Sequence, residues 1–285
     1  MALGYPTKTN MPSAFYGVKN VKKTKVFEIF SSSVVAITQG VLIKRVSRSD
    51  KEFHFQNWCE DRLGEVGVLF DKSGRNSYPD FKLVEFTEGY EIKGLALPGR
   101  ESSYDCNSQV PTGRHNGRDI FYIFGRYPKA NEAGNEYPVI DLVICHGDFL
   151  NADHEYVHKN KSVKGFGSYG DIMIRDRKMY VAPTPYAIAD GLTGTRTLLV
   201  PKSWKAPKTL KAVGEIVRVE SSQLVVGYEF DLKTNEIMTK TIPNSSAGQE
   251  HTFVAYRTKA DSDKPVEGLN VITDNSIIIC EDEDE

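Results

Sequence analysis

Short apolar runs, rich in β-branched and aromatic residues and closed by turn-forming residues, recur through most of this 285-residue chain. The strongest are DIFYIFGRY at 119–127 and YPVIDLVICHG at 137–147. Runs of this length and composition are typical of strands with little exposed surface. The chain is therefore expected to build its core around a β-sheet, with helices in the minority.

One segment has helical spacing instead, and it predicts a helix over residues 51–63. A capping residue precedes this segment and a glycine follows it. Apolar stretches at 26–30 and 34–46 are compatible with either a strand or a helix, and residues 148–162 with a short helix. The apolar residues at helical spacing are Phe55, Trp58, Cys59 and Leu63.

These patterns predict an α/β fold of the α+β kind, in which helices flank a mixed β-sheet. The chain divides into three parts. Residues 1–50 form a basic N-terminal arm with a β/α segment, and residues 51–201 form the core. Residues 202–285 form either a β-rich C-terminal lobe or an extension of the same sheet, ending in an acidic tail.

Composition restricts the class of protein. With 40% apolar and 26% charged residues, the chain is typical of an ordinary globular protein. No apolar run approaches the roughly 20 residues that a spanning helix needs, and the start lacks the apolar region of a secretion signal. The four cysteines are far apart, which indicates reduced thiols. We expect a cytoplasmic protein without a membrane partner and, for want of a phosphate-binding loop motif, without a nucleotide cofactor.

The formal net charge of -2 alone argues against a nucleic-acid partner. The last five residues are all acidic, however, and the remainder of the chain has a slight positive excess. Any contact with DNA therefore depends on local basic patches.

The most informative pattern is Pro79-Asp80, ten further residues, and then Glu91-Ile92-Lys93. Residues two apart in a strand share a face, so Glu91 and Lys93 should point the same way and Ile92 into the opposite layer. A hairpin with its turn near residues 86 and 87 would place Asp80 opposite Lys93 and diagonal to Glu91. The three polar groups would then lie together on one face.

Two carboxylates beside an amine suit hydrolysis of a phosphodiester bond. Magnesium prefers oxygen ligands and usually takes one or two carboxylates. Asp80 and Glu91 are the expected ligands, with the carbonyl of Ile92 as a third. A bound cation would acidify water and neutralise charge on the phosphate, and Lys93 would orient the water or hold the phosphate. The alternative is a solvated ion-pair face between neighbouring strands.

The order of a helix, a strand with P-D and a strand with E-x-K resembles the PD-(D/E)xK nuclease superfamily. The stretches FQNWCEDRL, NSYPDF, GYEIKGL and YDCNSQVPTGRHNGRDIFYIFGRYP, within residues 50–190, look like a type II restriction endonuclease. The resemblance implies a homodimer that cuts both strands of a specific DNA sequence with Mg2+ and leaves 5′-phosphate ends. It also implies that Asp80 and Glu91 bind the metal, that Lys93 is the motif lysine, and that Glu60 is a further helix acid.

Three polar segments are candidates for DNA contacts. Arginine can read guanine, and asparagine or glutamine can read adenine, while additional cations hold phosphates. Each segment is equally compatible with a polar surface loop or a charged strand edge. The candidates are Gln109, Arg114, His115, Asn116 and Arg118 in 108–118, Lys161 and Lys164 beside Gly165, and Arg175, Asp176, Arg177 and Lys178 in 174–180.

Other functions remain open. A non-catalytic β-rich DNA-binding or interaction protein would have the same strands without metal uptake at Glu91, and a structural or assembly protein would not bind DNA. A weaker hypothesis is a zinc site at Cys145, His146, His154 and His158, because His154 and His158 would share a helix face.

Overall fold

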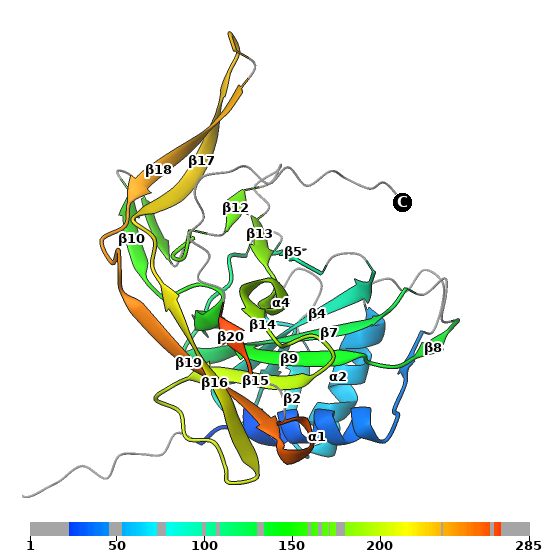
Figure 1. Ribbon diagram of the computed structural model, residues 1–285. Coiled ribbons are helices and arrows are strands. Elements are labelled where there is room, and N and C mark those ends of the chain that lie inside the picture. The colour runs from blue at the N-terminus through cyan, green and yellow to red at the C-terminus, as the bar shows by residue number, and fades with distance from the viewer. Residues whose placement is uncertain are drawn as a thin grey trace, which may run out of the picture.

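A computed structural model describes residues 23–45, 53–72, 78–98, 101–106, 109–129, 134–158, 161–164, 167–170, 172–174, 180–234, 236–262 and 265–268. Within these residues, a nine-stranded mixed sheet forms the centre of the molecule (Figure 1). The β4–β7 and β9–β15 pairs are parallel, and the other pairs along the sheet are antiparallel. Its strands, in spatial order, are β16 (Leu210–Val219), β19 (Glu250–Thr258), β15 (Arg196–Pro201), β9 (Asp141–His146), β7 (Arg118–Pro128), β4 (Glu88–Leu97), β3 (Phe81–Leu83) and β2 (Phe70–Lys72), with β6 (Arg114–His115) beside β7.

Two helices, α1 (Val26–Thr38) and α2 (Phe53–Glu65), cover one face of this sheet (Figure 1). In α1 the buried side chains recur at intervals of three and four residues, which gives the helix one apolar side. Helix α2 lies so close to β7 that a Cβ atom at Gly125 would be 2.0 Å from the Phe55 ring. Gly125 therefore allows the helix layer to pack directly on the strand.

The opposite face carries a second apolar core beneath smaller elements. A three-stranded sheet lies there, made of β12 (Met173–Ile174), β13 (Tyr180–Pro183) and β5 (Ser103–Asp105), together with the short helix α4 (Pro185–Ile188). The remaining elements are β1 (Ile43–Lys44) with β8 (Glu136–Tyr137), β10 (Glu155–His158) with β11 (Lys161–Lys164), β14 (Ala189–Asp190) with β20 (Glu267–Gly268), β17 (Gln223–Asp231) with β18 (Glu236–Pro243), and the 3₁₀ turns η1 (Gly147–Phe149) and η3 (Lys259–Asp261).

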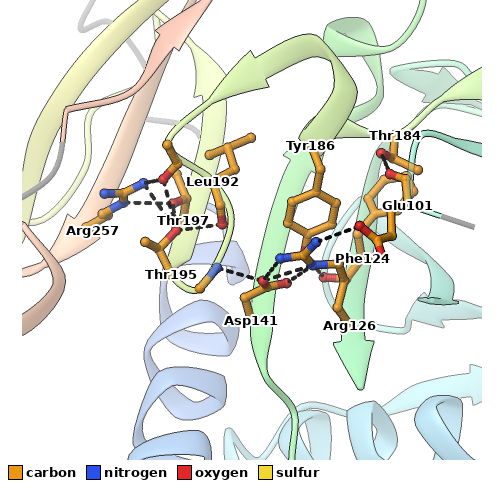
Figure 2. Close-up of polar contacts among 12 residues, drawn as sticks. Glu101, Phe124, Arg126, Asp141, Thr184, Tyr186, Leu192, Thr195, Thr197 and Arg257 are labelled. Carbon is orange, nitrogen blue, oxygen red and sulfur yellow. Dashed lines mark hydrogen bonds and ion pairs between the residues drawn. The ribbon is translucent and has the colours of Figure 1, made fainter. Parts of the chain in front are cut away.

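Buried polar contacts join the strands of the sheet on its β13 side (Figure 2). Arg126 in β7 and Asp141 in β9 are paired in the register, and the Arg126 Nε lies 2.9 Å from both carboxylate oxygens. The Arg126 guanidinium also lies over the Tyr186 ring, and Asp141 accepts the Gly194 N–H at 2.8 Å. The fully buried Arg257 donates to Thr197 Oγ1 at 2.8 Å and to the Gly191 carbonyl at 2.6 Å. These side chains tie β7, β9, β15 and β19 to the loop before β15.

The mixed sheet and the α+β class agree with the prediction from the sequence. The helix predicted over 51–63 is found at Phe53–Glu65, and the ambiguous stretch near residue 30 forms α1. Of the short helix considered within 148–162, only the end of the 3₁₀ turn η1 is present among the described residues, and the later part forms β10 and β11. Strands β16 and β19 extend the central sheet, whereas β17 and β18 form a hairpin that projects from the body (Figure 1).

None of the described helices combines the length and the apolar character needed to cross a membrane.

Candidate active site around Asp80, Glu91 and Lys93

The alternation of β4 separates its charged residues from its apolar ones. Ile92 is buried in the core under α1 and α2, and Glu91 and Lys93 point to the opposite face of the sheet. The Lys93 Nζ lies 2.8 Å from Glu91 Oε1. The two side chains are 17% and 15% exposed, so the pair is largely shielded but still reachable from solvent.

Asp80 joins this pair from the start of β3. The β3–β4 register pairs Phe81 with Tyr90 and Lys82 with Gly89, so its continuation brings Asp80 opposite Glu91. The expected position opposite Lys93 is therefore wrong by two residues, a shift that keeps Asp80 on the same face. The Asp80 Oδ2 accepts the Ile92 N–H at 2.7 Å, which fixes the carboxylate against β4.

The connection between β3 and β4 explains this register. It spans residues 84–87. The Arg118 Nη1 donates to the Leu83 carbonyl just before the connection, at 2.7 Å, and to the Phe86 carbonyl inside it, at 2.9 Å. The Arg118 guanidinium needs space beside these carbonyls. A four-residue connection provides this space, and a tight two-residue turn would not. Arg118 was a candidate DNA contact, and in the structure its guanidinium supports the strand connection that positions Asp80.

Gly89 allows the segment that carries Asp80 to approach β4. A Cβ atom at Gly89 would lie 2.6 Å from Pro79 Cγ, closer than side-chain atoms normally pack. The proline of the motif thus packs on the glycine, and this contact sets Asp80 beside its hydrogen-bond partner on β4.

Aromatic side chains and a thiol line the cluster on its buried side. The Tyr78 and Tyr122 hydroxyls lie 2.8 Å apart, and the Lys93 amine lies 5.8 Å from the centre of the Tyr104 ring. Burial raises the pKa of Tyr78 well above its ordinary value, and burial raises the pKa of Cys106 to about 12. At neutral pH these groups are therefore protonated, and they provide an environment of low polarity rather than further charge.

The charges of the cluster do not balance. Burial, followed by the neighbouring Glu91 carboxylate, raises the pKa of Asp80 to about 7, against the smaller opposing effects of the Ile92 N–H and Lys93. Burial lowers the pKa of Lys93, but the charge and hydrogen bond of Glu91 together with the charge of Asp80 outweigh burial, and the net shift is upward. One amine therefore faces two carboxylates, and the excess negative charge favours either a proton or a cation at this position.

This imbalance predicts a dependence of stability on pH. Because the pKa of Asp80 is higher in the folded chain than in the unfolded one, the folded chain keeps a proton that the unfolded chain loses. The free energy of unfolding should therefore fall by about 1 to 3 kcal/mol as the pH rises from about 4 to about 7. In urea titrations, Asp80→Asn should lack this loss, and Mg2+ at pH 8 should stabilise the wild type more than the variant. Equal pH slopes for the two proteins would contradict the prediction.

Of the other predicted metal ligands, Glu60 lies apart from the cluster, and the Ile92 carbonyl stays a prediction. Glu60 forms an ion pair with Lys72 of β2, at the edge of the sheet, and is not joined to Asp80 or Glu91. Ile92 contributes its N–H to Asp80. The structure thus brings together Asp80, Glu91 and Lys93 and leaves Glu60 apart.

One predicted DNA-contact segment lies against the cluster. The His115 ring packs edge-on to Tyr78 with centroids 5.0 Å apart, and Asn116 Nδ2 lies 3.1 Å from His115 Nε2. Asn116 and Gly117, both with positive φ, form the two-residue turn between β6 and β7. Arg114 is exposed in this hairpin, and the half-buried Gln109 donates to the Val110 carbonyl at 3.2 Å. The hairpin therefore presents polar side chains beside the acids.

The other two segments predicted to contact DNA are described only in part or not at all. Lys161 and Lys164 belong to β11, of which the backbone alone is described. The expected contacts at Arg175, Asp176, Arg177 and Lys178 fall outside the described residues.

Reasoning from the sequence missed two groups. Tyr78 directly precedes the motif, and its proximity to Tyr122 has no signal in the spacing of these residues.

The zinc hypothesis placed His154 and His158 on one helix face, but residues 155–158 are a strand, so that geometry is wrong. His154 instead meets Glu220 and His251, which lie 66 and 97 positions further along the chain.

Neither the scan against models of protein families nor the search of curated proteins gave a match for this chain.

Proposed function

We propose that this protein is a Mg2+-dependent endonuclease that cuts both strands of a specific double-stranded DNA sequence and leaves 5′-phosphate ends. The proposal depends above all on one observation. Asp80 and Glu91 meet on one sheet face, and Lys93 lies within hydrogen-bonding distance of Glu91. The order of helix, P-D strand and E-x-K strand in the fold is also that of the nuclease superfamily which the motif resembles.

Asp80 and Glu91 fit a magnesium ion. Both offer oxygen atoms, which are the ligands that Mg2+ prefers, and two carboxylates are as many as such sites usually use. Burial and then the Glu91 carboxylate raise the pKa of Asp80, and a cation would balance the charge of these two acids. When bound, Mg2+ would supply charge neutralisation at the phosphate and a lower pKa for water at the site.

The residues of the chain then have separate roles. The Ile92 N–H orients the Asp80 carboxylate, and the Lys93 amine beside Glu91 would hold the scissile phosphate or orient the attacking water. Arg114, His115 and Asn116, in the hairpin beside Tyr78, would contact the duplex close to the cleaved bond. As the resemblance implies, the active form would be a homodimer in which each site cuts one strand, and we expect it in the cytoplasm.

The test uses the full-length chain and a long DNA of known sequence. With Mg2+, the wild type should give discrete fragments whose sequenced ends share one short sequence, and chelation should stop the reaction. Glu91→Gln should remove cleavage, whereas Glu85→Gln, on the exposed part of the β3–β4 connection, should leave it unchanged. Undiminished cleavage by Glu91→Gln would overturn the metal site. DNA binding without cleavage by any of the proteins would favour the non-catalytic DNA-binding alternative.

A further inference from the structure

Three side chains of metal-ligating type meet outside the Asp80 cluster, where β16 ends. They are His154, in the segment before β10, Glu220, which follows β16, and His251 in β19. The backbone of Glu220 is held on both sides, because its N–H donates to the Gln249 carbonyl at 3.0 Å and its own carbonyl accepts the Gly248 N–H at 2.9 Å. These two hydrogen bonds fix the backbone that carries the carboxylate.

Both imidazoles address the same carboxylate oxygen. His251 Nε2 lies 2.7 Å from Glu220 Oε1, and His154 Nε2 is in contact with that oxygen too. The ligand atoms of all three side chains lie within 4.8 Å of one another. Two atoms that each lie 2.0 to 2.1 Å from a tetrahedral zinc ion are about 3.3 Å apart. A small movement of these side chains would therefore allow an ion to bind between them.

Burial and hydrogen bonding indicate a built site rather than a surface coincidence. The Glu220 side chain is 0% exposed, and its other oxygen, Oε2, accepts the Asn244 Nδ2 at 3.1 Å. Asn244 is itself fixed, since it donates to the Ser221 carbonyl and accepts the Ser246 N–H. An outer residue that orients a ligand in this way is typical of metal sites.

The histidines are also open toward solvent. Their side chains are 25% and 20% exposed. His251 helps line a cavity of about 330 Å³ together with Asp148 and Lys202.

We propose that His154, Glu220 and His251 bind a zinc ion and leave its fourth position open to water. Two histidines and one glutamate are a donor set that zinc accepts. The ion would join residues 151–154 to the outer strands β16 and β19, and so fix the segment that leads into the β10–β11 hairpin. The site goes beyond the proposed DNA cleavage and does not depend on it.

Zinc binding tests this proposal directly. The full-length chain, freed of metal with a chelator, is titrated with zinc chloride in a calorimeter in the presence of excess Mg2+. The wild type should take up about one zinc ion per chain, and its melting temperature should rise with zinc. His154→Gln and His251→Gln should each weaken zinc binding by at least about 100-fold and remove this rise. These positions are used because they are partly exposed, and the buried Glu220 is left unchanged.

Two further variants serve as controls. His115→Gln, in the β6–β7 turn, and Asp80→Asn should bind zinc like the wild type. The proposal is overturned if the His154 and His251 variants bind zinc as the wild type does, or if the wild type takes up none. It is also overturned if Asp80→Asn alone abolishes binding, because the zinc would then occupy the acidic cluster of β4. DNA cleavage plays no part in these readouts, so the failure of one proposal is distinguishable from the failure of the other.

Discussion

DNA cleavage should fall by about a hundred- to ten-thousandfold when Lys93 is replaced with methionine, while binding of a divalent metal is kept or strengthened. The amine is the cation that faces Glu91, at 2.8 Å. Its removal takes away the cation that lowers the pKa of Asp80, so this pKa should rise further and the need for a metal ion should increase. On the proposed function, the reaction loses the group that would hold the phosphate or orient the water, whereas the two carboxylates that would bind the metal ion remain.

The contrast between two variants makes this prediction specific. Calcium, used as a probe that need not support cleavage, is titrated calorimetrically, and single-turnover cleavage with Mg2+ is measured on one DNA fragment. Glu91→Gln should lose both metal binding and cleavage, and Lys93→Met should lose cleavage alone. Lys82→Met, on the neighbouring strand, is the matched control and should behave like the wild type. If Lys93→Met cleaves within tenfold of the wild type, the amine has no role in the reaction.

The faces of the strands were predictable from the sequence, and their register was not. Alternation alone places Glu91 and Lys93 on one side of β4 and Ile92 on the other, because a strand has a period of two. The pairing of Asp80 depends on the length of the β3–β4 connection. Arg118, which binds the carbonyls of Leu83 and Phe86 in and beside this connection, lies more than 30 positions further along the chain. Local patterns contain no information on such a contact.

The same distinction applies to the fold. The helix at 53–65 has clear apolar spacing and was predicted to within two residues at each end. The stretch that becomes α1 is rich in β-branched residues, and its helical state depends on packing against α2 and the sheet. The group of His154, Glu220 and His251 forms only when β16 and β19 pair at the far side of the sheet. Groups made by distant strands cannot be read from spacing along the chain.

Asp141→Ala should lower the free energy of unfolding by about 3 to 5 kcal/mol, because it removes the buried counter-charge of the Arg126 guanidinium and leaves it the partly exposed Glu101 carboxylate at 3.7 Å. The Arg126 and Asp141 side chains are 4% and 0% exposed, so solvent cannot replace the lost partner (Figure 2). The Gly194 N–H, which donates to Asp141 at 2.8 Å, also loses its acceptor. Urea titrations of the wild type and the variant measure this difference.

Two comparisons separate charge burial from a general loss of side-chain volume. Replacing both partners, as Arg126→Met with Asp141→Leu, should recover most of the lost stability, since no charge then remains buried. A loss of about 1 to 3 kcal/mol in the free energy of unfolding should remain, because the Gly194 N–H still lacks an acceptor. Glu215→Ala, which breaks the exposed pair with Lys202, should cost less than about 1 kcal/mol. A double variant no more stable than Asp141→Ala would mean that the strands depend on the ion pair itself, and not merely on its charges being balanced.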